Sequence, residues 1–212
     1  IQSNGFGDYK IISNQGTLSY WRDIFESFID NNFTNTAFLL QDSISTFNYN
    51  LIEFNDTTVN KSFFMIRENL NLEYYDSNRV DNIYDDVQGS FDNGWGLYII
   101  NPESTNNQVV IELPHPNDDF ISPYVGIEMF LQLDAFALLL AGAGREVKWT
   151  EQGNYNNDKS LSDPSRNANS PFHVFHEVLS DSLVNLGPHS PIVLHVHSFD
   201  ENDSHAGFNS II

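Results

Sequence analysis

The sequence predicts an α/β domain with a mixed, mostly parallel sheet and flanking helices. The second half of the chain alternates short apolar runs with segments of helical spacing, the order that a sheet covered by helices requires. The 212 residues include 40% hydrophobic and 14% aromatic side chains, enough to bury one substantial core. No internal repeat or low-complexity linker interrupts the chain, so residues 1–212 are predicted to form a single domain.

The first half of the chain favours a helix followed by strands. Residues 18–29 carry apolar side chains at helical spacing, and residues 47–75 indicate strands separated by Asn-Asp and Asn-Lys turns. Two further apolar runs, residues 95–100 and 109–113, are joined by a segment of polar turn residues. This pattern predicts a β-hairpin.

The rest of the chain continues the α/β alternation. Residues 124–133 have helical spacing, and residues 136–140 are uniformly apolar, which is typical of a buried strand. Residues 171–186 form the clearest helical pattern, with Ser170 as N-cap and a proline at the first helical position. A last apolar run begins at residue 191. Ligands gather at the carboxyl ends of strands in such sheets, so residues that follow these runs are candidates for a site.

The composition narrows the classes of partner. The formal charge is −20, from 29 acidic and 9 basic residues, which argues against nucleic acid because cationic side chains bind its phosphates. No run approaches the roughly 18 apolar residues of a membrane helix, so membrane insertion is not expected. With no cysteine, any metal must be held by His, Asp and Glu. The acidity, the few lysines and the many asparagines favour a secreted or periplasmic bacterial protein.

Two strand ends that carry histidines predict a metal site. His115 follows one apolar run and is followed by Asp118 and Asp119. His195 and His197 end the last run, and both project the same way because alternate side chains of a strand share a face. A catalytic zinc takes three protein ligands and leaves one position for water. We therefore expect a Zn²⁺ site made by His115, Asp118 or Asp119 or both, and His195 or His197 or both.

The same residues have a simpler interpretation. The prolines, asparagine and aspartates around His115 are turn formers, so this segment also fits a surface turn. The end of a strand can expose histidines to solvent without any role in binding. A polar residue on a buried face is costly unless it is paired. If the last strand lies in the centre of the sheet, its histidines are therefore expected to have a functional role. If it lies at an edge, simple solvent exposure is favoured.

Four residues are candidates for substrate binding. Arg145 follows a glycine-containing segment at the end of an apolar run, and its guanidinium could hold a substrate carboxylate through two parallel hydrogen bonds. Surface ion pairing is the alternative for this arginine. Arg166 and Asn167 precede the clearest helix and could line a pocket, and His173 lies in the first turn of that helix.

The two histidine motifs resemble those of zinc-dependent hydrolases of the carboxypeptidase and N-formylglutamate amidohydrolase type. Residues 114–119, Pro-His-Pro-Asn-Asp-Asp, are similar to the first zinc-binding element of these families, and residues 194–197, Leu-His-Val-His, to the second. The resemblance covers roughly residues 95–205. It implies a zinc exopeptidase-like or phosphorylase/hydrolase-like fold and a role for Arg145 or Arg166 in holding a substrate carboxylate. Carboxypeptidases have glutamate where this chain has Asp118.

One departure from the family concerns the general base. The carboxypeptidase glutamate lies on a strand well after the last zinc histidine, whereas this sequence ends at Ile212, fifteen residues after His197. Residues 209–212 indicate a strand that is just beginning. Three alternatives follow: the domain is truncated before its base, or Glu201 or Asp200 in the polar loop after His197 is the base, or the site is not catalytic.

The sequence thus predicts a zinc-dependent hydrolase that cleaves an amide or peptide bond in a small or peptide-like substrate. One alternative is a secreted, non-catalytic binding or accessory domain with the same fold. Another is a different metal-dependent hydrolase, such as a phosphoesterase. The metal hypothesis requires that His115 and His197 come within about 3 to 4 Å of each other.

Overall fold

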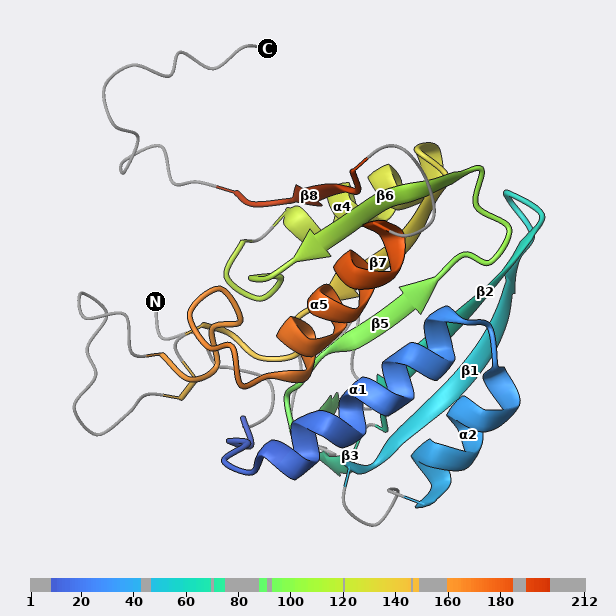
Figure 1. The fold of residues 1–212 in the computed structure, drawn as a ribbon. Coiled ribbons are helices and arrows are strands. Elements are labelled where there is room, and N and C mark those ends of the chain that lie inside the picture. The colour runs from blue at the N-terminus through green and yellow to red at the C-terminus, as the bar shows by residue number, and fades with distance from the viewer. Residues whose placement is uncertain are drawn as a thin grey trace.

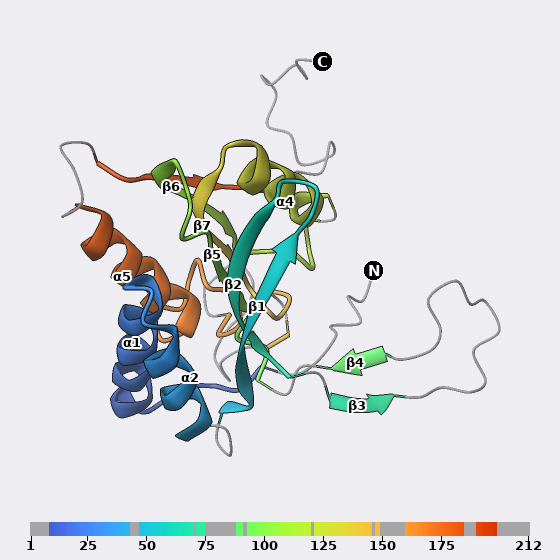
Figure 2. The same ribbon diagram turned by 90° about the vertical axis from the view of Figure 1, so that its right-hand side faces the viewer.

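The computed structural model describes residues 9–42, 47–69, 71–74, 88–90, 93–119, 121–145, 147–148, 160–184 and 190–198. In this part of the chain a six-stranded sheet lies between helices (Figure 1), and a separate pair of short strands projects from one end (Figure 2). The helices are α1 (Gln15–Ile29), α2 (Phe33–Asp42), α4 (Ser122–Gln132) and α5 (Pro171–Val184). The strands are β1 (Tyr49–Asp56), β2 (Lys61–Glu68), β3 (Asn71–Tyr74), β4 (Gln88–Ser90), β5 (Leu97–Ile100), β6 (Asn106–Leu113), β7 (Ala135–Leu140) and β8 (Ile192–His195).

The sheet is open and mixed, with the strand order β1-β2-β5-β7-β6-β8. The pairs β1–β2, β2–β5 and β5–β7 are antiparallel, and the pairs β7–β6 and β6–β8 are parallel. The predicted α/β class is confirmed. The expectation of a mostly parallel sheet is wrong, because three of the five neighbouring pairs are antiparallel and only β7–β6 and β6–β8, in the second half of the chain, are parallel.

The predicted hairpin between residues 95–100 and 109–113 is also wrong. β7 lies between these two strands, antiparallel to β5 and parallel to β6. The first five residues of β7 are buried, so this strand is most stable in the centre of the sheet, with a neighbour on each side. Its uniformly apolar sequence predicted the burial but not which two strands it would separate.

The three predicted helices are confirmed as α1, α4 and α5, and α1 and α5 begin at a capping side chain. The Asn14 side chain accepts a hydrogen bond from the Gly16 amide at 2.8 Å at the start of α1. Ser170 Oγ accepts from the His173 amide at 3.2 Å at the start of α5, as predicted. Figure 2 shows α1, α2 and α5 on one face of the sheet and α4 on the other. None of the described helices is long and apolar enough to cross a bilayer.

The topology brings three strand ends together. The chain passes from β6 through α4 to β7 on one face, and from β7 through α5 to β8 on the other. The parallel strands β7, β6 and β8 therefore share one carboxyl edge, where this class of sheet binds its ligands. At the left of Figure 1 the ends of β6 and β8 lie near the segment that leads into α5.

Candidate metal centre

Three side chains that follow β6 and β8 converge on one point. His115 Nδ1 lies 3.3 Å from His197 Nδ1 and 3.9 Å from Asp119 Oδ2, and His197 Nδ1 lies 2.9 Å from the same oxygen. Ligands bound at about 2.0–2.1 Å around a tetrahedral zinc are roughly 3.3 Å apart. The required approach of His115 and His197 is confirmed, and the three residues, called here the metal group, could hold one ion.

The turn between β6 and α4 determines which aspartate joins the metal group. The amides of Asp118 and Asp119 both donate to the carbonyl of His115, at 3.1 and 2.8 Å, which makes a single helical turn. Side chains four residues apart on such a turn lie on the same side, so Asp119 faces His115. Asp118 points to the loop after β7, where its Oδ2 accepts a hydrogen bond from the Arg145 amide at 2.8 Å.

The two histidines of β8 have different partners. Val196 packs into the core cluster beneath α4, so His195 and His197 on either side of it project to the opposite face, as predicted. His197 joins the metal group, whereas His195 Nε2 lies 2.9 Å from Glu112 Oε2. β8 lies at the edge of the sheet, the position that by itself favours simple solvent exposure. The convergence of His197 on two buried residues is what argues for a binding role.

Asp163 orients the buried ring of His115. Its Oδ1 lies 2.9 Å from His115 Nε2, and it is only 2% exposed. Burial raises the pKa of Asp163, but hydrogen bonds to His115 and to the Ser165 amide, with the charges of His115 and Arg166, outweigh it and hold this pKa below its ordinary value. The ionised carboxylate only accepts hydrogen bonds, so in the neutral ring Nε2 carries the proton. The lone pair of Nδ1 then faces the metal group, and carboxylate–histidine pairs of this kind are typical of metal sites.

Both predicted substrate arginines lie against acids of this site. Arg145 Nη2 is 3.6 Å from Asp119 Oδ1, and Arg166 Nε is 3.3 Å from Asp163 Oδ2. Each acid therefore divides its two oxygens between a histidine and an arginine. The arginine side chains are 29% and 28% exposed, so each could also contact a ligand.

The other predicted site residues are placed elsewhere or are not described. Asn167 donates to the Leu161 carbonyl at 2.7 Å and stabilises the loop before α5. His173 Nε2 lies 3.3 Å from Glu177 Oε1 on the same helix. Asp200 and Glu201 lie outside the described residues.

The sequence interpretation missed Asp163, Glu112 and His176 as candidates. His176 Nδ1 lies 2.7 Å from Glu112 Oε1; this hydrogen bond raises the pKa of His176, although burial opposes the change. Glu112 could have been found, because a single charged residue interrupts an apolar strand. Asp163 carries no such signal, since nothing in the sequence links it to a histidine 48 residues earlier.

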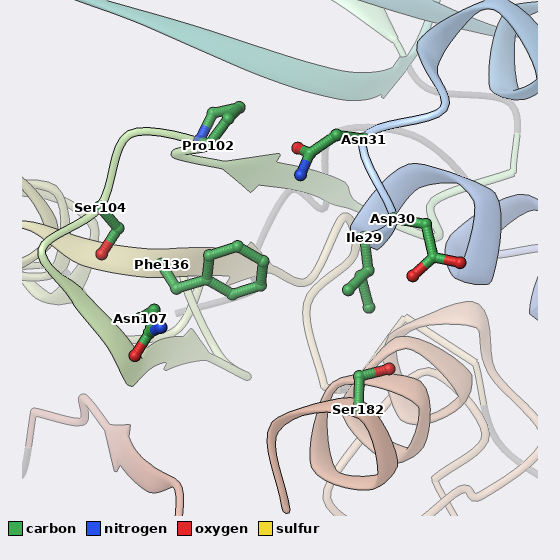
Figure 3. Close-up of a pocket in the computed structure, with 8 residues that line it drawn as sticks. All are labelled: Ile29, Asp30, Asn31, Pro102, Ser104, Asn107, Phe136 and Ser182. Carbon is green, nitrogen blue, oxygen red and sulfur yellow. The ribbon is translucent and has the colours of Figure 1, made fainter. Parts of the chain in front are cut away.

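A separate hollow of about 520 Å³ lies at the other end of the parallel strands (Figure 3). Asn107 and Phe136, the second residues of β6 and β7, line it on one side. Asp30, directly after α1, and Ser182 of α5 line it on the other. At about 3.3 Å per residue, the length of β6 separates it from His115 by roughly 25 Å. One carboxylate and no histidine are among the described residues that line it, so it offers no comparable ligand set.

Comparisons of the chain with models of protein families, with curated proteins and with solved structures find no match. The likeness to zinc-dependent hydrolases of the carboxypeptidase and N-formylglutamate amidohydrolase type therefore stays a hypothesis based on its two short motifs.

Proposed function

We propose that this protein is a zinc-dependent hydrolase that cleaves an amide or peptide bond in a small or peptide-like substrate. The observation that supports the proposal is the metal group, in which three ligand atoms from two strand ends lie within 4.8 Å of one another. Three protein ligands leave one position for water or substrate, which is the pattern of catalytic rather than structural zinc. The bound ion would supply Lewis acidity and lower the pKa of its water.

The surrounding residues have proposed roles in holding ligands and substrate. Asp163 fixes His115, and Arg145 holds the second oxygen of Asp119 while the exposed part of its guanidinium faces the substrate. An arginine there suits a substrate with a carboxylate, such as an acylated amino acid or a peptide terminus. Asp200 and Glu201 follow His197 by three and four residues, and we propose one of them as the proton acceptor.

The first test is metal content. We expect one Zn²⁺ per chain in the purified protein by elemental analysis, and loss of that zinc in His115→Ala and His197→Ala. Asn107→Ala, at the far end of β6, is the control that should keep the ion. A wild-type protein that binds no zinc from a buffered Zn²⁺ solution would contradict the proposal. Once zinc is found, a panel of acylated amino acids and a chromogenic phosphate ester would separate amide hydrolysis from phosphoester hydrolysis.

A second candidate, a non-catalytic binding or accessory domain, is favoured by a different observation. The metal group already has hydrogen-bond partners without an ion, because His197 contacts Asp119 at 2.9 Å and His115 contacts Asp163, outside the group, at 2.9 Å. Two buried aspartates paired in this way need no ion to be satisfied. This candidate predicts that the protein has no bound zinc and that His115→Ala changes stability rather than activity.

A further inference from the structure

Glu112 is a buried carboxylate near the carboxyl end of β6, the strand next to the edge strand β8, and two histidines from different elements contact its oxygens. Its Oε1 lies 2.7 Å from Nδ1 of His176 on α5, and its Oε2 lies 2.9 Å from Nε2 of His195 on β8. Glu112 is 1% exposed, whereas the histidine side chains are 34% and 49% exposed. A buried charge is costly unless it is paired, so the two contacts account for how β6 accommodates a glutamate.

His197 follows a short strand at the edge of the sheet. β8 is four residues long and lies at the edge of the sheet, and its first residue, Ile192, is 54% exposed. Short edge strands make few hydrogen bonds, and their ends fray easily. The position of His197, two residues past the end of this strand, therefore depends on how that end is fixed.

Glu112 fixes the end of β8 at two points. Its backbone carbonyl accepts a hydrogen bond from the Val196 amide at 2.9 Å, which extends the ladder one residue beyond the strand. Its side chain holds the His195 ring on the α5 face, while Val196 is buried on the α4 face. Residues 195 and 196 are thus held on both faces of the sheet directly before His197.

We infer that Glu112 is a positioning residue for the metal group: through His195 it sets the place of His197, and His195 is not itself a ligand. The inference rests on the proposed metal site. His195 lies outside the group of described residues whose ligand atoms fall within 4.8 Å of one another, which agrees with a supporting role. Partners of this kind typically change metal affinity by about 10–100-fold when removed.

A matched pair of amide substitutions at His195 tests the inference. The amide nitrogen of glutamine falls near the place of Nε2, the atom that contacts Glu112, whereas that of asparagine falls near Nδ1. We expect His195→Asn to weaken Zn²⁺ binding by about 10–100-fold in competition with a chromogenic chelator. We expect His195→Gln to bind within about threefold of wild type, because its N–H still donates to Glu112. His176→Gln, which changes the other partner of Glu112 and leaves β8 untouched, should also stay close to wild type.

Cobalt substitution distinguishes positioning from direct ligation. If His195 only positions His197, the visible spectrum of bound Co²⁺ in His195→Gln should match that of wild type. Equal weakening in both His195 variants, with a changed Co²⁺ spectrum, would show that His195 is a ligand and overturn the inference. Unchanged affinity in His195→Asn would overturn it as well. If wild-type protein binds neither ion, the proposed metal site itself fails, which is a separate result from either of these.

Discussion

The acids of the candidate site are balanced by arginines. Asp119 and Asp163 are each 2% exposed, and each has an arginine within 3.6 Å in addition to its histidine. Arg145 also lies 3.9 Å from Asp118, so two guanidinium groups face three carboxylates and compensate most of their charge before any ion binds. We therefore expect the metal-free protein to fold. Bound metal should increase the free energy of unfolding by an amount that depends on the metal affinity, but it should not be required for folding.

The first prediction concerns the tautomer of His115. In Asp163→Asn the amide can donate to Nε2, which moves the ring proton to Nδ1, the atom that faces the metal group. We expect Zn²⁺ affinity to fall by about 10–100-fold, measured by chelator competition, and ¹⁵N shifts of the His115 ring to report the exchanged tautomer. Arg166→Gln, which keeps the Asp163 contact to His115, is the control. Unchanged affinity in Asp163→Asn would show that this contact does not orient a ligand.

At the level of elements, the sequence predicted helices that have their own cap and apolar face. It did not predict features that depend on neighbouring elements, such as the order of the strands. The helix over residues 171–186 was recognisable because Ser170 caps it and its apolar residues share one face, and α5 begins as expected. α2 was missed, since only two of its ten residues, Thr36 and Leu40, are buried. The order of β5, β7 and β6 could not be predicted, because pairing depends on which strands best cover β7.

The attachment of α5 to the sheet is predicted to depend on pH through His176. The hydrogen bond with Glu112 raises the pKa of His176 above its ordinary value. A raised pKa in the folded state means that the pair stabilises the fold fully below the ordinary histidine pKa of about 6.5, and that this stabilisation is lost as pH rises through the folded-state value. The charged or titratable described side chains around the pair are Glu177 and His173 on α5, His195 on β8, and Arg22 on α1 through its contact with Glu177.

Urea unfolding of wild type and His176→Gln between pH 5 and pH 9 measures this contribution. We expect the difference in free energy of unfolding between the two proteins to be largest at the acidic end and to shrink as the pH rises. The two proteins share all other titratable groups, so the difference between them cancels the pH effects of those groups. What remains is the effect of the His176 ring. A difference that grows with pH would contradict the assigned contact.

At the level of the whole molecule, the site was predictable only in its outline. His115 and His197 were found because each follows an apolar run, and parallel strands end at one edge of the sheet. The choice between Asp118 and Asp119 required the turn geometry, and the separation of His195 from His197 required Glu112 on the neighbouring strand. Contacts across the sheet depend on register, which a single sequence does not give.

The net charge of −20 predicts that salt stabilises the fold. Asp23 and Glu26 are exposed on α1 and Asp30 directly after it, and three acids, Glu26, Asp30 and Asp181, line one hollow that contains a single arginine, Arg22. Repulsion of this kind is screened as the Debye length falls from about 30 Å at 0.01 M to about 8 Å at 0.15 M salt. If screening contributes about 1 kcal/mol, the Tm of metal-free protein should rise by about 2–4 °C over that range in NaCl.

The double variant Asp23→Asn, Glu26→Gln should start from a higher Tm and respond less to salt, since it carries two fewer of the repelling charges. If its response equals that of wild type, the acidic face of α1 is not a source of the repulsion, and a Tm that falls with salt would mean that attractive ion pairs such as Arg22–Glu177 outweigh the net charge.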